Sequence, residues 1–187
     1  GGFMNNCYLD AEAVITFFRM TGRKHIFITG SRGSGKSHLV NNMLKHMSDS
    51  FNLLQSHRTD TPQVVIKSNL VADNKEFVIG VPRTSGINPA SKGNNMTIIE
   101  DGFINCAIPA IDTHLDTTPE RLFVIDELGY LESSCIPFQK AVEKLLDNSH
   151  VLAVIRKQST EFLNRICNRK DVLFIDIDST FETLSCI

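Results

Sequence analysis

The chain has 187 residues, of which 42% are hydrophobic and 21% charged, and its formal net charge is −2; this length predicts one globular domain over residues 1–187. The nearly balanced charge excludes a global attraction to nucleic acid or to an anionic membrane, and no apolar run approaches the roughly 18 residues that span a bilayer. Five cysteines without a C-x-x-C pair argue against a disulfide framework or a zinc site, so we expect a cytoplasmic protein.

The first predicted element is an amphipathic helix over residues 10–21, with Asp10 as its cap. It belongs to an N-terminal extension, residues 1–24, that we expect to cover one face of a sheet. The side chains expected to face inward are Val14, Phe17 and Phe18.

A short apolar strand at residues 25–29 comes next, followed by the sequence G-x-x-x-x-G-K-S and a helix over residues 36–47. This order of strand, glycine-rich turn and helix is the context of a phosphate-binding loop, or P-loop. Gly30 and Gly35 are expected to adopt backbone angles that other residues resist, so that loop N–H groups and the positive helix end hold a nucleotide phosphate. The residues predicted to bind a nucleoside triphosphate are Gly30, Ser31, Arg32, Gly33, Ser34, Gly35, Lys36, Ser37 and His38.

Two side chains of this loop have more specific expected roles. The ammonium group of Lys36 is expected to reach the β- and γ-phosphates. The hydroxyl of Ser37 is expected to ligate Mg²⁺, which the nucleotide carries.

Residues 63–81 have a β pattern that predicts a hairpin. Two apolar runs, 64–66 and 77–79, flank a turn-like segment at 72–74. The following segment, 82–95, is rich in Gly, Ser, Asn and Pro, which predicts a long loop with a functional role.

A strand is expected at residues 96–100, followed by a helix that Asp101 caps and Pro109 bends. The side chains expected on the inward face of this helix are Phe103, Ile104, Ala107, Ile108 and Ile111.

An apolar strand at residues 122–125 then delivers two adjacent carboxylates, Asp126 and Glu127, at its C-terminal end. Ligands of open parallel sheets bind at that edge. Asp126 is expected to help hold Mg²⁺, and Glu127 to orient the attacking water and take up its proton. The alternative is that the pair only opens a loop or caps a helix.

The last third of the chain alternates helices and strands: a helix that begins near Pro137, a strand at 151–155, a helix at 159–169 and a strand at 172–177. Such alternation implies right-handed crossovers and a mostly parallel sheet covered by helices on both faces. The predicted fold class is therefore α/β.

Residues 124–132, V-I-D-E-L-G-Y-L-E, closely resemble the I-D-E-[IL]-G-x-[ML]-E segment of a family of small P-loop nucleoside-triphosphatases, which includes the cancer-related nucleoside-triphosphatase and its thermophile relatives. The hairpin at 64–81, the strand and proline-containing helix within 98–110 and the run at 168–172 match the same family in the same order. The resemblance covers roughly residues 25–177.

This resemblance implies a P-loop NTPase fold with an inserted β-hairpin at about 63–81, Mg²⁺ as cofactor and weak discrimination among bases. It also implies that Glu127 lies at the attacking water and that Glu132 occupies a family position whose role could be structural. Many members carry an arginine shortly after the last strand, but residues 178–184 contain none.

A charge-stabilising arginine must then come from elsewhere, and the candidates are Arg32, Arg83 and Arg156. Arg156 and its neighbour Lys157 are expected at the same sheet edge as Asp126, so Arg156 is the catalytic candidate on geometry. The alternative is a solvated charge at a strand end. The six histidines show no metal-ligand spacing and are expected on the surface or on helix faces.

The favoured function is an Mg²⁺-dependent nucleoside-triphosphatase that releases a nucleoside diphosphate and phosphate. Two alternatives stay open: a nucleotide or nucleoside kinase whose 82–95 loop holds the acceptor, and a slow regulatory switch that binds a protein or RNA partner. We expect a monomer without membrane attachment and leave a partner protein open.

Overall fold

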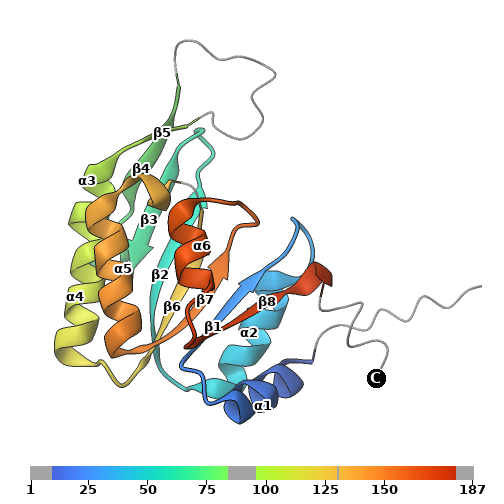
Figure 1. Ribbon diagram of the computed structural model, residues 1–187. Coiled ribbons are helices and arrows are strands. Elements are labelled where there is room, and N and C mark those ends of the chain that lie inside the picture. Colours follow the sequence, from blue (N-terminus) through green and yellow to red (C-terminus); the bar gives the residue numbers. More distant parts are fainter. Residues whose placement is uncertain (1–9, 84–95, 130, 180–187) are drawn as a thin grey trace, which may run out of the picture.

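One eight-stranded sheet runs through the described part of this computed structural model, residues 10–83, 96–129 and 131–179 (Figure 1). Its strand order is β5-β4-β3-β2-β6-β7-β1-β8. The strands are β1 (His25–Thr29), β2 (Phe51–Arg58), β3 (Val64–Ser68), β4 (Phe77–Pro82), β5 (Met96–Ile98), β6 (Leu122–Leu128), β7 (His150–Ile155) and β8 (Val172–Asp176).

The sheet has a parallel part and an antiparallel part that meet at β2. Strands β2, β6, β7, β1 and β8 are parallel neighbours, whereas β2 to β5 pair antiparallel. The mostly parallel sheet and the hairpin of β3 and β4 confirm the prediction. Strand β2 was not predicted, and the 82–95 loop falls largely outside the described residues.

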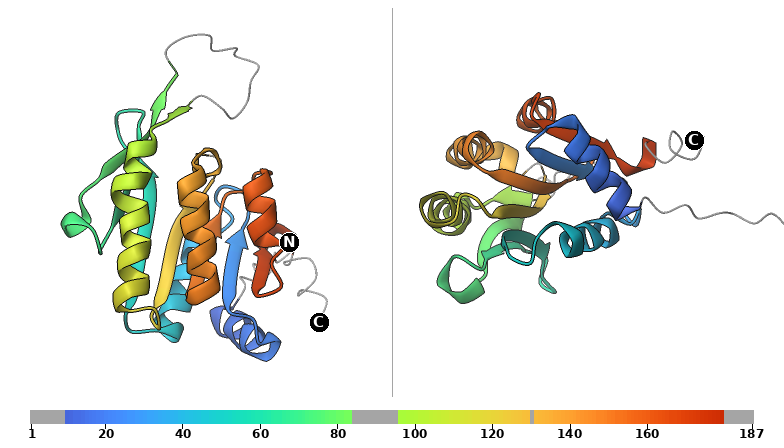
Figure 2. Two further views of the ribbon diagram at one scale, coloured as in Figure 1. Left: turned by 60° about the vertical axis from the view of Figure 1, so that its left-hand side comes forward. Right: turned by 90° about the horizontal axis from the view of Figure 1, so that it is seen from below.

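Helices cover both faces of the sheet, as predicted (Figure 2). Helices α1 and α2 pack on one face over one apolar cluster, and α4, α5 and α6 cover the other face over a second cluster. The helices are α1 (Ala11–Thr21), α2 (Lys36–Met47), α3 (Glu100–Gly102), α4 (Ile108–Thr117), α5 (Ile136–Asn148) and α6 (Glu161–Cys167).

Helix α1 matches the predicted helix, with Asp10 accepting a hydrogen bond from the Glu12 N–H at its cap. Its buried face differs in one position. Val14 is buried, but Phe17 is 56% exposed because the helix turns Ala11, Val14 and Ile15 toward the sheet. The prediction that Phe17 faces inward was therefore wrong.

The helical segment after β5 begins two residues earlier than predicted, at Glu100, and its cap is Ile99 and not Asp101. A π-helical stretch, Phe103–Ala107, joins α3 to α4, and Pro109 lies in the first turn of α4. Because proline lacks an N–H, Pro109 cannot donate a backbone hydrogen bond to the preceding turn, and the wider π-helical turn before it accommodates this loss. This change of pitch leaves Ile104 45% exposed, against the prediction.

Two histidines are buried, His114 on a helix face of α4, as the prediction allowed, and His25 in strand β1, which contradicts it. His25 lies in β1, where Nε2 is 2.8 Å from the Leu146 carbonyl oxygen and Nδ1 accepts the Val151 N–H at 3.1 Å. His114 is 2.8 Å from the Asn52 amide nitrogen and 2.7 Å from the Ser149 hydroxyl. Burial lowers the pKa of both rings, and hydrogen bonds replace the water they lose.

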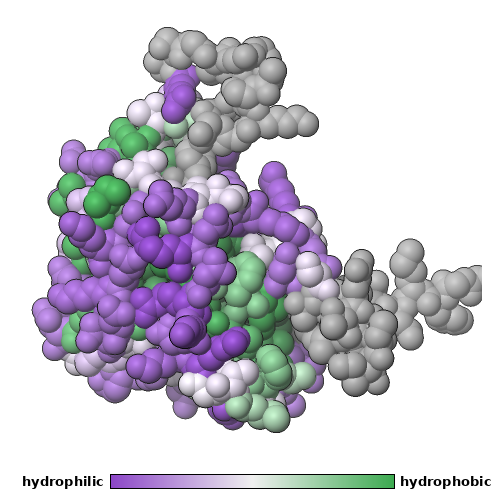
Figure 3. Space-filling model, in the orientation of Figure 1, coloured by the Kyte–Doolittle hydropathy of each residue, from purple (hydrophilic) through white to green (hydrophobic). Residues whose placement is uncertain are grey.

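The surface is largely hydrophilic over α4, α5 and α6, whereas hydrophobic colour gathers over β8 and α1 (Figure 3). The large apolar side chains exposed on those two elements are Phe17, Met20 and Phe174. Within the described residues, no helix combines the length and the apolar character needed to cross a membrane.

Gly102 gives a test of how α3 packs on β4. A Cβ atom at this position would overlap the Val78 carbonyl oxygen and lie 2.6 Å from Ile79 Cγ2. We expect Gly102→Ala to lower the free energy of unfolding by roughly 1–3 kcal/mol, measured by urea denaturation.

The matched control is Gly22→Ala, because a Cβ there would meet nothing within 4 Å and only the φ of +69° opposes it. Its expected cost is about 1 kcal/mol. Equal stability of Gly102→Ala and the wild type would contradict the packing of α3 against β4.

Candidate active site

The P-loop connects β1 to α2, and its glycines serve two different purposes. Gly33 and Gly35 have φ angles of +77° and +93°, which other residues rarely adopt. Gly30 does not have a positive φ, so the predicted reason for this glycine was wrong. A Cβ at Gly30 would lie 2.6 Å from Ser34 Oγ, so a larger residue there would have to displace that hydroxyl.

Lys36 folds back over the start of the loop. Its Nζ donates to the carbonyl oxygen of Gly30 at 2.7 Å and lies 3.4 Å from that of Ser31. The Oγ of Ser34 is buried and has no hydrogen-bond partner among the described residues. The loop therefore holds an ammonium group bound only to neutral carbonyl oxygens and an unpartnered hydroxyl, and both suit an anionic ligand.

The remaining predicted loop residues face solvent. Arg32, Ser37 and His38 are exposed, and His38 Nε2 lies 3.2 Å from the Asn42 amide nitrogen in α2. Their assignment to the nucleotide stays a prediction.

The predicted carboxylates arrive at the same sheet edge from β6. Strand β7 lies between β1 and β6, and its Val154 is in register with Ile28 on one side and with Asp126 on the other. Two strand spacings, or about 10 Å, therefore separate the end of β1 from Asp126. Because Asp126 follows Val124 by two residues, its side chain points to the face that α2 covers.

The surroundings of Asp126 oppose its ionisation. Burial raises its pKa, and the adjacent Glu127 carboxylate raises it further. A hydrogen bond from Gln55 in β2 and the charge of Lys36 act in the opposite direction.

Glu127 is held from two sides. The Nε of Arg156, just beyond β7, donates to Glu127 Oε1 at 2.7 Å, with both side chains partly exposed. The hydroxyl of Ser56 in β2 donates to the Glu127 carbonyl oxygen at 3.2 Å. The structure thus brings together Glu127 and Arg156, the two residues that the sequence nominated for catalysis besides Lys36.

The turn after β6 depends on a buried carboxyl group. Glu132 is 4% exposed, and its Oε2 accepts the N–H of Gly129 at 2.8 Å. Burial raises the pKa of Glu132 to about 7. A Cβ at Gly129 would come within 3.0 Å of Arg156 Cδ, so this turn packs against the arginine that holds Glu127. A structural role for Glu132 fits these contacts.

The other arginine candidates differ in position. Arg32 lines a hollow of about 310 Å³ beside the P-loop, together with Ser31, Gly33, Ser34, Ile177 and Asp178. Arg83 follows β4, which lies in the antiparallel part of the sheet, far from β1 in the strand order.

Sequence reasoning missed Gln55 and Ser56, because it did not foresee β2, and it missed Asp178. The Asp178 carboxylate accepts hydrogen bonds from the Ser31 N–H and the Lys157 ammonium group. The P-loop pattern and the strand before Asp126 gave no signal for these partners.

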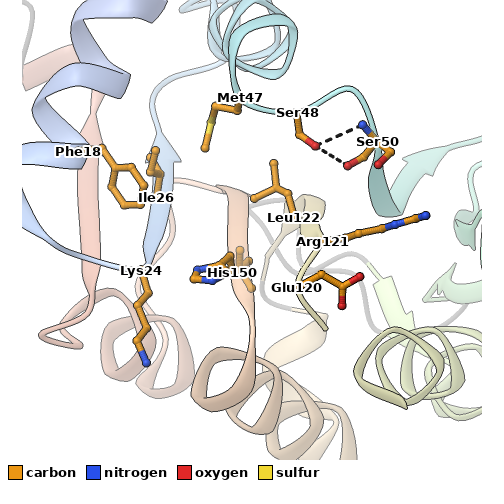
Figure 4. Close-up of a pocket in the computed structure, with 11 residues that line it drawn as sticks. Phe18, Lys24, Ile26, Met47, Ser48, Ser50, Glu120, Arg121, Leu122 and His150 are labelled. Atoms are coloured by element: carbon orange, nitrogen blue, oxygen red, sulfur yellow. Dashed lines mark hydrogen bonds between the residues drawn. The ribbon is translucent and has the colours of Figure 1, made fainter. Parts of the chain in front are cut away.

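A hollow of about 330 Å³ lies at the opposite edge of the sheet, where β1, β6 and β7 begin (Figure 4). Apolar side chains, among them Phe18, Ile26 and Leu122, face it, and Lys24 and Arg121 lie at its rim. It contains none of the predicted site residues. Because nucleotides of parallel sheets bind at the carboxyl ends of the strands, we do not place the active site there.

Comparison with known proteins identifies the family. A family model described as NTPase matches residues 25–181. The chain belongs to this NTPase family. The resemblance seen in the sequence is thereby confirmed, and the match includes both the P-loop and the acid pair.

Curated relatives of this NTPase chain carry the name nucleoside-triphosphatase THEP1. The protein from Thermotoga sp. strain RQ2 is 26% identical over 155 residues, covering 82% of this chain and 86% of that protein. The protein from Thermotoga maritima is 23% identical over 154 residues, with coverage of 82% and 86%.

Solved structures share the fold. THEP1 from Aquifex aeolicus has a TM-score of 0.63 and 18% identity, covering 82% of this chain and 89% of that one. A human cancer-related nucleoside triphosphatase has a TM-score of 0.60 and 17% identity, with coverage of 87% and 96%. These likenesses confirm the predicted P-loop NTPase fold.

Glu132 gives a pH-dependent test of the site's architecture. Its pKa is about 7 in the folded protein, against an ordinary value of 4.5. Between these values the unfolded chain has lost the proton that the folded chain retains, so the free energy of unfolding falls as pH rises. The expected loss is about 3 kcal/mol by pH 8.

Glu132→Gln keeps an oxygen for the Gly129 N–H but cannot titrate. Urea denaturation at pH 5 and pH 8 should therefore show a smaller decrease in stability for this variant than for the wild type. Identical decreases in the two proteins would rule out a protonated, buried Glu132.

Proposed function

We propose that the protein is an Mg²⁺-dependent nucleoside-triphosphatase that cleaves the β–γ bond of ATP, GTP and other nucleoside triphosphates with low base selectivity. The observation that carries the proposal is the register of the central strands. Val154 of β7 pairs with Ile28 of β1 on one side and with Asp126 of β6 on the other, so the P-loop and Asp126 lie at the same edge of the sheet. The name of the Thermotoga relatives, nucleoside-triphosphatase, supports the reaction class.

The loop provides the phosphate site. Its N–H groups and the N-terminus of α2 offer partial positive charge to the β-phosphate. Lys36, now on the carbonyl oxygens of Gly30 and Ser31, is a long side chain that can exchange these neutral acceptors for charged phosphate oxygens. That exchange is favourable because hydrogen bonds between two charged groups are the stronger ones.

The donor set fits Mg²⁺. We assign the Ser37 hydroxyl and the Asp126 carboxylate to it, the latter through a water. Among the described residues no group of three or more His, Cys, Asp or Glu could hold a metal by itself. This agrees with Mg²⁺, which uses few protein ligands and takes further oxygens from a nucleotide. When bound, the ion neutralises charge that develops on the phosphates.

Glu127 is the proposed base. It would accept the proton of a water whose oxygen bonds to the γ-phosphorus, while the bond to the β-phosphate oxygen breaks and the nucleoside diphosphate leaves. Arg156 already binds Oε1 of Glu127, so we assign the other carboxylate oxygen to the water. The arginine would thereby fix the orientation of the base and add positive charge beside the phosphates.

Phosphate release from ATP, GTP, CTP and UTP tests the function. We expect release from all four in the presence of Mg²⁺, at rates within about tenfold of one another, and none when EDTA removes the metal. Lys36→Ala should abolish detectable binding, because it removes the cation that faces the γ-phosphate. Transfer of phosphate to an added nucleoside, without release to water, would instead indicate a kinase.

Glu127→Gln separates binding from chemistry. The amide keeps the size of the side chain but cannot accept the proton, so turnover should fall by roughly 10²- to 10⁴-fold. Affinity for the Mg-nucleotide, measured by calorimetry, should change little. Wild-type turnover in this variant would remove Glu127 from the water-orienting role.

A further inference from the structure

Asp178, just beyond β8, holds the outer side of the P-loop. Its Oδ2 accepts the backbone N–H of Ser31 at 2.8 Å, and its Oδ1 accepts the Ser31 hydroxyl at 3.1 Å. One carboxylate therefore makes two parallel hydrogen bonds to one residue, which fixes both the position and the rotation of that peptide unit. No other described side chain bonds to the Ser31 N–H.

Lys157, just beyond β7, balances the charge of this carboxylate. Its Nζ lies 2.9 Å from Asp178 Oδ2 and 3.3 Å from Asp176 Oδ2. The hydrogen bond from Lys157 is the main reason that the pKa of Asp178 is lowered, and the reciprocal bond raises the pKa of Lys157. The pairing lets a carboxylate lie against the P-loop with little net repulsion of a triphosphate.

Lys36 and Asp178 hold the same dipeptide by different groups. Lys36 binds the carbonyl oxygens of Gly30 and Ser31, whereas Asp178 binds the N–H and hydroxyl of Ser31. When Lys36 turns to a phosphate, the first contact is lost and the second can persist. The start of the loop then keeps its conformation while the phosphate binds.

We propose that Asp178 is a positioning residue that braces the P-loop and so increases its affinity for the triphosphate. The inference rests on the proposed function, because it concerns the same loop and the same ligand. A loop that is already ordered loses less conformational entropy on binding, and this difference appears as affinity. Asp178 touches no reacting atom in this arrangement, so its effect falls on binding and not on the chemical step.

The test is Asp178→Asn, which keeps the shape of the side chain and removes its charge. Because charge-assisted hydrogen bonds are lost, we expect the dissociation constant for Mg-ATP and the KM to rise about tenfold, with kcat unchanged. Glu143→Gln is the matched control, because Glu143 pairs with Arg165 at similar exposure on α5 and α6, away from the P-loop. The control should bind Mg-ATP like the wild type.

A double-mutant cycle with Ser31→Ala tests whether the effect passes through Ser31. If it does, the two substitutions together should weaken binding by less than the product of their separate effects. Asp178→Glu, which retains the charge, should restore part of the affinity. Independent effects of the two substitutions, or a fall in kcat at constant KM, would overturn the proposal.

Hydrogen exchange of residues 30–35 without nucleotide separates this proposal from the proposed function. Asp178→Asn should accelerate exchange in this segment, and Glu143→Gln should not. A wild-type protein that fails to bind any triphosphate refutes the proposed function, whatever the exchange result. If Asp178→Asn exchanges amide hydrogens in residues 30–35 and binds Mg-ATP like the wild type, the proposed role of Asp178 is refuted and the proposed function is not.

Discussion

The structure depends on the register of three parallel strands. Val154 in the middle strand pairs with Ile28 and with Asp126, so the segments that end β1 and β6 emerge in one row. A slip by one residue would exchange the side chains that pack against the two layers of helices. The burial of β1, β6 and β7 between two layers of helices thus fixes the distance between the phosphate loop and the acid pair.

The candidate site residues lie at the ends of four neighbouring strands and form hydrogen bonds with one another. Arg156 beyond β7 binds Glu127 at the C-terminal end of β6, and Asp178 beyond β8 binds Ser31 beyond β1. Each contact joins segments that are adjacent in space and distant in the chain. The P-loop and Glu127 therefore each have a hydrogen-bond partner that follows the neighbouring strand.

Much of the fold could be predicted from the sequence because apolar periodicity is local. The hairpin of β3 and β4, the acid-bearing β6 and the helices α1, α2 and α5 each have a repeating pattern within a few residues. Strand β2 does not: its buried Asn52 contacts His114, 62 residues away, and no nearby residue indicates that partner. His25 is likewise buried because Leu146 and Val151 supply its hydrogen bonds.

The same distinction applies to the site. Loop residues and the Asp126–Glu127 pair could be located because each motif is contiguous, and Arg156 because it follows a recognisable strand. Asp178 lies 147 residues from Ser31, so only the completed sheet brings the two together. The conformation of Gly30 was misjudged for a related reason, since its neighbour Ser34 approaches it only once the loop is folded.

Strand β2 is parallel to β6 along one side and antiparallel to β3 along the other. It therefore divides the sheet into a parallel half, which carries the P-loop and the acid pair, and an antiparallel half that ends at β5. Insertions and deletions beyond β3 can change the outer margin without shifting the strands that carry the loop and the acid pair.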